Sequence, residues 1–340
     1  MDRLIDAIER VNNPSVVGLD PKPALLPEPL LTAARSVRGI KRAKALANAY
    51  WLFNKTIIDS ISDVVAAVKP QIAMYEALGI PGVLTYVRTA EYAQSKGLYV
   101  LGDVKRGDIG STAAAYASHL SGLPALDTDD DTDADLTAAA ASADMWHEDA
   151  VTINPYLGSD GITPFVEAAA AHDKDVFVLV RTSNPSSSQL QTLRVSGGES
   201  DGEQIAERVG HLVEQWGSQT RGHYGYSRVG AVVGATHPDE GRRLRELLPH
   251  TFFLVPGFGA QGGSAADVAA MFDAQGRGAI VNSSRGIIAA WKKDPEAEAF
   301  ASAGNDDAEA ALALVGRCAR AAALNMRDSI NKELEKRNEH

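Results

Sequence analysis

The chain has 340 residues, of which 45% are hydrophobic, and its formal net charge is −11. This length and apolar content allow a large core, whereas the acidic balance argues against nonspecific nucleic-acid binding, which needs a broad basic surface. The first ten residues contain several charged side chains, and no apolar stretch approaches bilayer-spanning length. We therefore expect a cytoplasmic protein without a signal peptide or a membrane span.

Eight short apolar segments alternate with stretches of helical pattern along the chain. They cover residues 16–20, 64–69, 99–105, 150–155, 176–183, 229–236, 252–259 and 279–285. Such near-continuous apolar runs are typical of parallel strands that have helices on one side and a packed barrel interior on the other. The alternation predicts a (β/α)8 barrel, although the pattern alone leaves open whether the sheet closes.

Helix boundaries are predicted from residues with special backbone or capping chemistry. Leu4, Ile5 and Ile8 indicate an opening helix, and residues 306–336 a long closing helix. The internal signals are Gly97 as a left-handed C-cap, Pro164 in a first turn, Ser200 with Glu203 as a capping box, and Pro238 and Ser264 at helix starts.

Two segments do not fit the alternation. Residues 121–143 are acidic and rich in alanine, and we interpret them as a surface insertion with a short helix at 136–141 in a single domain spanning 1–340. Residues 186–200 form a second long loop that follows a predicted strand end, where barrel enzymes build their active sites. We therefore expect this second loop to lie closer to the functional site.

The most informative stretch is GDVKRGDIGST at residues 102–112. Side chains alternate along a strand, so Asp103 and Lys105 are expected on one face, and Asp108 falls beyond the strand end. Two charges on the inward face of an apolar strand would be costly without a role. This pattern favours a catalytic site over an ordinary surface turn.

The segment DVKRGDIGSTAAAYA resembles the signature of the orotidine 5′-phosphate decarboxylase family, especially its longer, type 2 subfamily. VGLD at 17–20, VKPQ at 68–71, PGFGAQGG at 256–263 and NSSRG at 282–286 resemble further motifs of the same family. The motifs occur in the expected order and each lies at a predicted strand end. The resemblance thus extends over nearly the whole barrel.

The resemblance implies decarboxylation of orotidine 5′-monophosphate to uridine 5′-monophosphate in de novo pyrimidine biosynthesis, without a cofactor or a metal ion. It implies a charged network of Lys69, Asp103, Lys105 and Asp108, with Lys105 as the proton donor to C6. Asp108 would reach the neighbouring subunit's site, so a homodimer with shared active sites is expected.

The resemblance also implies the residues that bind the substrate. Ile109 and Thr112 would come from the partner beside the pyrimidine and ribose, and Asp20 would bind a ribose hydroxyl. Ser183 would contact the pyrimidine amide edge. The phosphate would be held by Gln261 and Arg285 in loops that also contain Pro256, Gly262 and Ser284.

The chemistry accounts for these residue types. Loss of carbon dioxide from C6 leaves an electron pair in the plane of the ring, outside the π system, so a fixed cation must stabilise it. Flanking carboxylates keep a lysine protonated until it delivers its proton. Glycine-rich loops let backbone N–H groups approach a phosphate closely.

Two alternatives stay open at this point. One is another phosphosugar decarboxylase or synthase of the same barrel suprafamily that uses Mg²⁺, although Lys69 stands where a carboxylate ligand would be wanted. The other is a catalytically silent barrel that binds a phosphorylated metabolite. An intact set of Lys69, Asp103, Lys105 and Asp108 argues against that binder.

Overall fold

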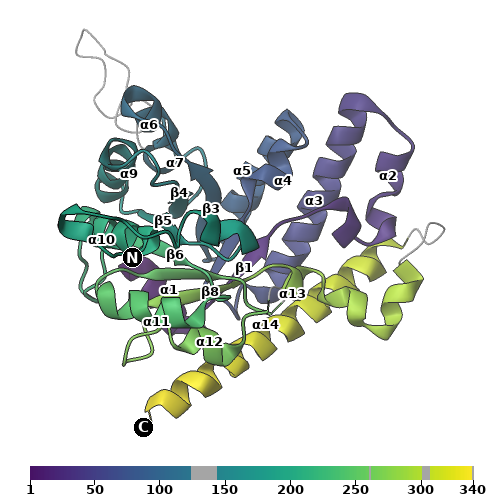
Figure 1. The fold of residues 1–340 in the computed structure, drawn as a ribbon. Helices are drawn as coiled ribbons and strands as arrows, with labels where there is room; N and C mark the ends of the chain where they lie inside the picture. Colours follow the sequence, from purple (N-terminus) through teal and green to yellow (C-terminus); the bar gives the residue numbers. More distant parts are fainter. Residues whose placement is uncertain (124–143, 260–261, 301–306, 339–340) are drawn as a thin grey trace.

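The computed structural model describes residues 1–123, 144–259, 262–300 and 307–338, and in them eight parallel strands close into a barrel in chain order (Figure 1). The last strand pairs with the first, with Ser15 opposite Val281. The predicted (β/α)8 fold is therefore confirmed, including the closure that the pattern had left open. The strands are β1 Ser15–Leu19, β2 Ala67–Pro70, β3 Tyr99–Arg106, β4 Ala150–Ile153, β5 Asp175–Arg181, β6 Val229–Val233, β7 Phe253–Pro256 and β8 Ala279–Ser283.

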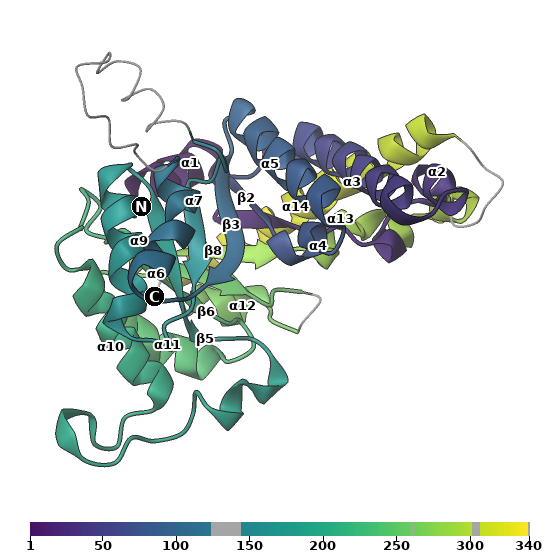
Figure 2. The same cartoon turned by 90° about the horizontal axis from the view of Figure 1, so that it is seen from above.

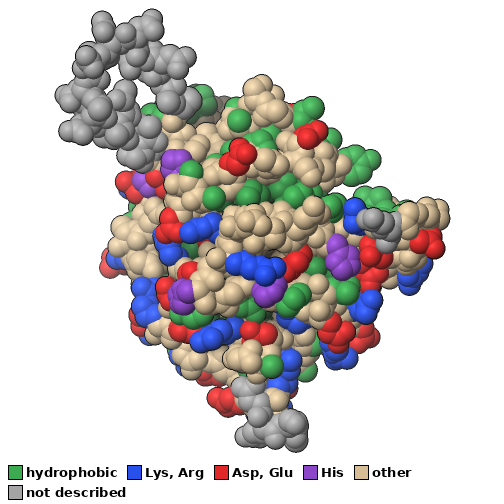
Figure 3. All heavy atoms as spheres, turned by 90° about the vertical axis from the view of Figure 1, so that its left-hand side faces the viewer, with side chains coloured by type: hydrophobic (Ala, Val, Ile, Leu, Met, Phe, Trp, Pro, Cys, Tyr) green, Lys and Arg blue, Asp and Glu red, His purple; other side chains and the backbone are tan. Residues whose placement is uncertain are grey.

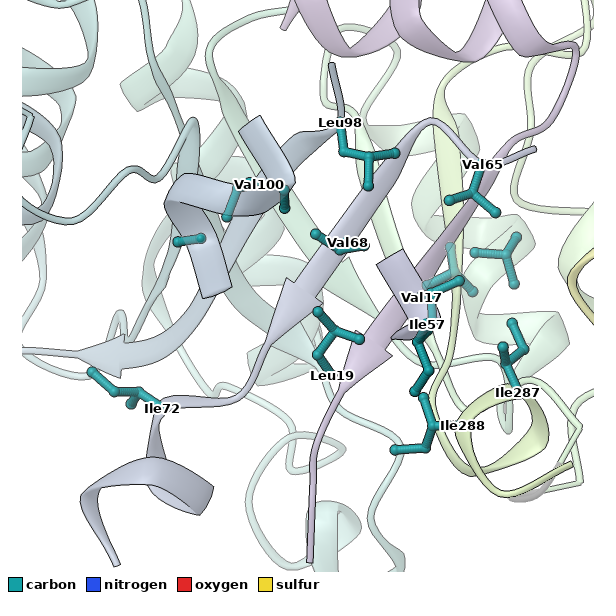
Figure 4. Packing of buried hydrophobic residues seen from close by; sticks show 14 of the residues in the cluster. Val17, Leu19, Ile57, Val65, Val68, Ile72, Leu98, Val100, Ile287 and Ile288 are labelled. Carbon is teal, nitrogen blue, oxygen red and sulfur yellow. The ribbon is translucent and has the colours of Figure 1, made fainter. Parts of the chain in front are cut away.

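Both faces of the strands are buried, which explains their near-continuous apolar character. Val16 belongs to a cluster inside the barrel, whereas its neighbour Val17 belongs to a cluster between the strands and the surrounding helices. Figure 4 shows the second cluster, in which Val17 of β1 lies near Ile57 and Ile288 from two helices. Leu4 joins the interior cluster from the first helix.

Helices surround the barrel and follow the strands in sequence. Figures 1 and 2 show α3 and the long α14 side by side on one flank of the barrel. The α-helices are α1 Asp2–Val11, α2 Thr32–Arg35, α3 Gly39–Ile61, α4 Ile72–Glu76, α5 Ile80–Ser95, α6 Gly110–Tyr116, α7 Ser118–Ser121, α9 Ser159–Ala171, α10 Ile205–Gly217, α11 Pro238–Leu247, α12 Ala265–Ala269, α13 Arg285–Ile288 and α14 Ala308–Asn338. Short 3-10 turns are η1 Pro23–Leu25, η2 Glu28–Leu30, η3 Pro185–Gln189, η4 Gly198–Ser200, η5 Ala290–Lys293 and η6 Pro295–Phe300.

Several predicted helix boundaries are confirmed. Gly97 has a φ of +77° and directly follows the C-cap of α5. Pro238 is the first residue of α11, and the Ser264 hydroxyl accepts the N–H of Asp267 at the start of α12. The opening and closing helices are present as α1 and α14.

Two boundary predictions are wrong. Pro164 lies inside α9 because the left-handed Gly158, with a φ of +69°, already starts that helix at Ser159. The capping box of α10 is formed by Gln204 and Glu207, while Ser200 ends the separate turn η4.

The two irregular segments have different outcomes. Residues 124–143, including the helix predicted at 136–141, lie outside the described residues. The 186–200 loop follows β5 as expected, and contains most of η3 and all of η4. Among the described helices, none has the length and apolar character to cross a membrane.

Candidate active site

Three charged side chains form a continuous row at the carboxyl ends of β2 and β3. The ammonium of Lys69 donates a hydrogen bond to Oδ2 of Asp103 at 2.7 Å. The ammonium of Lys105 donates to the other oxygen, Oδ1, of the same carboxylate. One buried carboxylate therefore links two lysines, and the predicted grouping of these three residues is present in the structure.

Electrostatics keeps Asp103 and Lys69 charged. Burial would raise the pKa of Asp103, but Lys69 and Lys105 outweigh it and hold that pKa well below its ordinary value. Burial likewise opposes the charge of Lys69, yet the carboxylates of Asp103 and Asp20 raise its pKa above the ordinary value. Asp103 is thus an anion and Lys69 a cation at neutral pH.

Lys105 differs from its two neighbours in exposure and in backbone conformation. Its side chain is 45% exposed, against 6% for Lys69 and 10% for Asp103, so its ammonium borders the open space above the barrel. Its φ of +46° lies in the left-handed region that residues with a side chain rarely adopt. The β3–β4 pairing also shifts register between Gly102 and Arg106. Lys105 is therefore held at an irregular point of the strand.

The residues after β3 point elsewhere within this chain. Oδ1 of Asp108 accepts the backbone N–H of Ile109 at 2.8 Å, and among the described residues Asp108 has no hydrogen bond to Lys69 or Lys105. Ile109 is 52% exposed, and Thr112 on α6 is exposed as well. The fourth charge of the predicted network is therefore not joined to the other three within one subunit.

A pocket of about 430 Å³ opens beside the row, at the carboxyl ends of β1, β7 and β8. Its volume lies in the range of small-molecule sites. Two of its acceptor atoms, Oδ1 of Asp20 and Oδ1 of Asn282, are buried and have no hydrogen-bond partner among the described residues. The pocket is lined by Asp20, Lys22, Leu25, Met74, Gly257, Phe258, Asn282, Ser284 and Arg285.

The predicted binding residues Asp20, Ser284 and Arg285 thus meet in one pocket, but its other six lining residues were not among the predicted site residues. Lys22 and Met74 carry no local signal. Phe258 and Asn282 lie inside the PGFG and NSSRG motifs, and Asn282 is a polar residue that directly follows the apolar run 279–281 of its strand. That last signal was available from the sequence.

Glycines allow the loops at this end of the barrel to approach one another. A Cβ on Gly18 would lie 1.8 Å from Oγ of Ser284, so Ser284 packs directly over this backbone. A Cβ on Gly234 would lie 2.8 Å from Cα of Ser183, which follows β5. Ser183 is thereby held close to the loop that follows β6.

Backbone hydrogen bonds join the described residues of the predicted phosphate loop. Gly262 has a φ of +102°, and Gly259 accepts and donates backbone hydrogen bonds that close the loop on itself. Pro256 ends β7 opposite Asn282 of β8, and Arg285 begins α13 with an exposed side chain. Gln261 lies outside the described residues. Among the described residues, no group of three or more His, Cys, Asp or Glu side chains is arranged to hold a metal ion.

The sequence of the chain matches a known protein family over most of its length. Residues 52–301 match the sequence profile of the orotidine 5′-phosphate decarboxylase / HUMPS family. The chain belongs to this family. The family expected from the motifs is therefore confirmed, whereas membership of its longer, type 2 subfamily stays a prediction.

Individual members of the orotidine 5′-phosphate decarboxylase / HUMPS family match most of the chain. The orotidine 5′-phosphate decarboxylase of Rhodopirellula baltica is 43% identical over 288 residues, which are 85% of this chain and 87% of that protein. The enzyme of the same name from Clostridium acetobutylicum is 37% identical and covers 98% of this chain and 99% of its own. The solved OMP decarboxylase of Leishmania donovani has a TM-score of 0.66 at 28% identity, with 98% of each chain covered.

Proposed function

We propose that this chain decarboxylates orotidine 5′-monophosphate to uridine 5′-monophosphate and carbon dioxide in pyrimidine biosynthesis, with Lys105 as the proton donor. The observation that carries the proposal is the row in which one buried carboxylate, Asp103, binds the ammonium groups of Lys69 and Lys105. The substrate is inferred from the family and from the names of its matching members. The row contains the cationic group that the reaction needs.

Lys105 has the properties required of the proton donor. Departure of carbon dioxide leaves negative charge on C6, and a nearby ammonium stabilises that charge before it transfers a proton. Lys105 is the most exposed member of the row, and its ammonium donates a hydrogen bond to Oδ1 of Asp103, which holds it in place. Lys69, on the opposite oxygen, keeps Asp103 ionised.

The neighbouring pocket is the proposed binding site for the rest of the substrate. Asp20, with a buried and unpartnered oxygen, would accept a hydrogen bond from a ribose hydroxyl. Arg285 would bind the phosphate together with Gln261, Gly262, Pro256 and Ser284. Ser183 would bind the amide edge of the pyrimidine.

We further propose a homodimer in which Asp108, Ile109 and Thr112 complete the partner's site. Figure 3 shows hydrophobic side chains gathered over the upper part of the face seen from the left of Figure 1, above a lower part rich in charges. Exposed apolar residues also cluster where α6 packs against α9. They are Ile109, Tyr116, Tyr156 and Leu157. An exposed apolar cluster of this kind favours a protein interface.

A spectrophotometric assay with orotidine monophosphate, with and without a chelator, tests the function. We expect turnover that the chelator leaves unchanged, because the described site uses side-chain cations. Turnover of a phosphosugar that is lost with the chelator would favour the Mg²⁺-dependent alternative. Tight binding of uridine monophosphate without turnover would favour the silent binding barrel.

A further inference from the structure

Thr152 on β4 joins two members of the catalytic row through a single hydroxyl. Its Oγ1 donates a hydrogen bond to Oδ1 of Asp103 at 3.0 Å and accepts the backbone N–H of Lys105, also at 3.0 Å. The residue is only 1% exposed. The contact to Asp103 is buried and the contact to Lys105 is partly buried, so water competes little for the first of them.

The contact to Lys105 replaces a bond that the sheet does not provide. Gly102 pairs with Val151, and the next paired residues are Arg106 and Ile153. Three residues of β3 thus face the single residue Thr152 of β4. Within this bulge, the N–H of Lys105 is bonded by a side chain instead of a strand carbonyl.

The hydrogen bond between Thr152 and the Lys105 N–H stabilises an unfavourable backbone conformation. Lys105 has a φ of +46°, a conformation that is unfavourable for a residue with a Cβ and persists only where its surroundings fix it. The left-handed turn directs the Lys105 side chain back to Asp103, whose Oδ1 it shares with the Thr152 hydroxyl.

The direction of the hydrogen bonds follows from the charges. An ionised carboxylate only accepts hydrogen bonds, so the single hydroxyl proton of Thr152 goes to Asp103. The hydroxyl lone pairs then face the N–H of Lys105. One hydroxyl therefore satisfies a buried anion and a strained backbone at the same time, which a hydrocarbon side chain of equal size cannot do.

We propose that Thr152 is a positioning residue for decarboxylation: it fixes the left-handed backbone of Lys105 and orients Asp103, so that the ammonium is held in place before the substrate arrives. This inference rests on the proposed role of Lys105. Thr152 itself need not touch the substrate.

Thr152→Val removes the hydroxyl at nearly constant volume, and Thr152→Ser keeps it. We expect the valine variant to lower kcat for orotidine monophosphate about 10- to 100-fold, as for a small misplacement of a catalytic group, with KM within about threefold. The serine variant should recover most of kcat. Thr89→Val is the matched control, because Thr89 is a fully buried threonine on α5, away from the row.

An unchanged kcat in Thr152→Val would overturn the inference. Equal losses of kcat in the valine and serine variants would also overturn it if both variants show a fall in Tm like that of Thr89→Val. Such a result would indicate that Thr152 has a packing role only. Should the valine variant not fold, Thr152→Ala removes the same hydroxyl. A crystal structure of either variant gives a readout independent of turnover: Lys105 should leave the left-handed region, and an unchanged φ would contradict the inference. Absence of turnover in the unmodified chain would count against the proposed function instead.

Discussion

The electrostatic balance of the site depends on Asp103. Its carboxylate is almost fully buried, and it is ionised because two ammonium groups outweigh the effect of burial on its pKa. Removing one partner of such a buried pair leaves the other without compensation. Loss of the Asp103 carboxylate would affect Lys69 most. The Lys69 side chain is only 6% exposed, and its ammonium would lose the anion to which it donates a hydrogen bond.

Asp103→Asn should therefore lower stability in a pH-dependent way. Its folded pKa lies below the unfolded value of about 3.9, so the contribution of the ionised group is complete above that value and is lost as pH falls towards the folded pKa. We expect the variant to be less stable by about 2 kcal/mol near pH 7, with the gap narrowing by about 1 kcal/mol at pH 3.

Urea unfolding across this pH range measures the effect. Asp239→Asn is a suitable control, because the Asp239 side chain is 95% exposed and should change stability little at any pH. A stability gap for Asp103→Asn that does not vary with pH would show that the carboxylate is not held ionised by its neighbours.

At the level of elements, strand β3 shows what the sequence can and cannot predict. Its apolar run and the spacing of Asp103 and Lys105 predicted a strand with charges at its carboxyl end, which the structure contains as β3. The left-handed backbone of Lys105 was not predictable, because it accompanies a bulge against β4 and a hydrogen bond that the Lys105 N–H donates to Thr152, a residue far along the chain. Tertiary partners, not local sequence, determine such a conformation.

Helix boundaries illustrate a second limit. Two pairs of residues a few positions apart could form the same kind of helix cap: Ser200 with Glu203, and Gln204 with Glu207. In the structure only the pair Gln204 and Glu207 caps α10. Pocket residues such as Lys22 and Met74 were missed for a similar reason, since only the closed barrel brings them next to Asp20. The (β/α)8 fold follows a periodic signal and was predicted correctly. Motif signals pointed to Lys69, Asp103 and Lys105, which are in contact in the structure, and their catalytic roles stay predictions.

At the scale of the whole molecule, the proposed dimer explains why Asp108 lies apart from the row of Lys69, Asp103 and Lys105. Asp108 has no hydrogen bond to that row among the described residues, and its neighbour Ile109 is exposed. A two-fold interface repeats each contact, so two subunits would exchange these residues symmetrically.

Mixed subunits test this exchange. Lys105→Ala and Asp108→Ala subunits should each be nearly inactive alone, because every site in either homodimer lacks one group. After mixing, about half of the dimers are hybrids with one intact site of two, so activity should approach about one quarter of the unmodified level. No recovery after verified subunit exchange would place Asp108 in its own subunit's site or outside catalysis.

The central claim is that Lys105 supplies the cation and the proton, and single-turnover decarboxylation by Lys105→Ala tests it most directly. Lys174→Ala is the control for loss of a lysine. Lys174 is buried and directly precedes the amino end of β5, whereas the site lies at the carboxyl ends of the strands. We predict that the Lys105 variant loses at least about 10³-fold in rate, while uridine monophosphate binding changes by less than about tenfold. A rate within about tenfold of the unmodified protein, with the fold intact, would contradict the assignment.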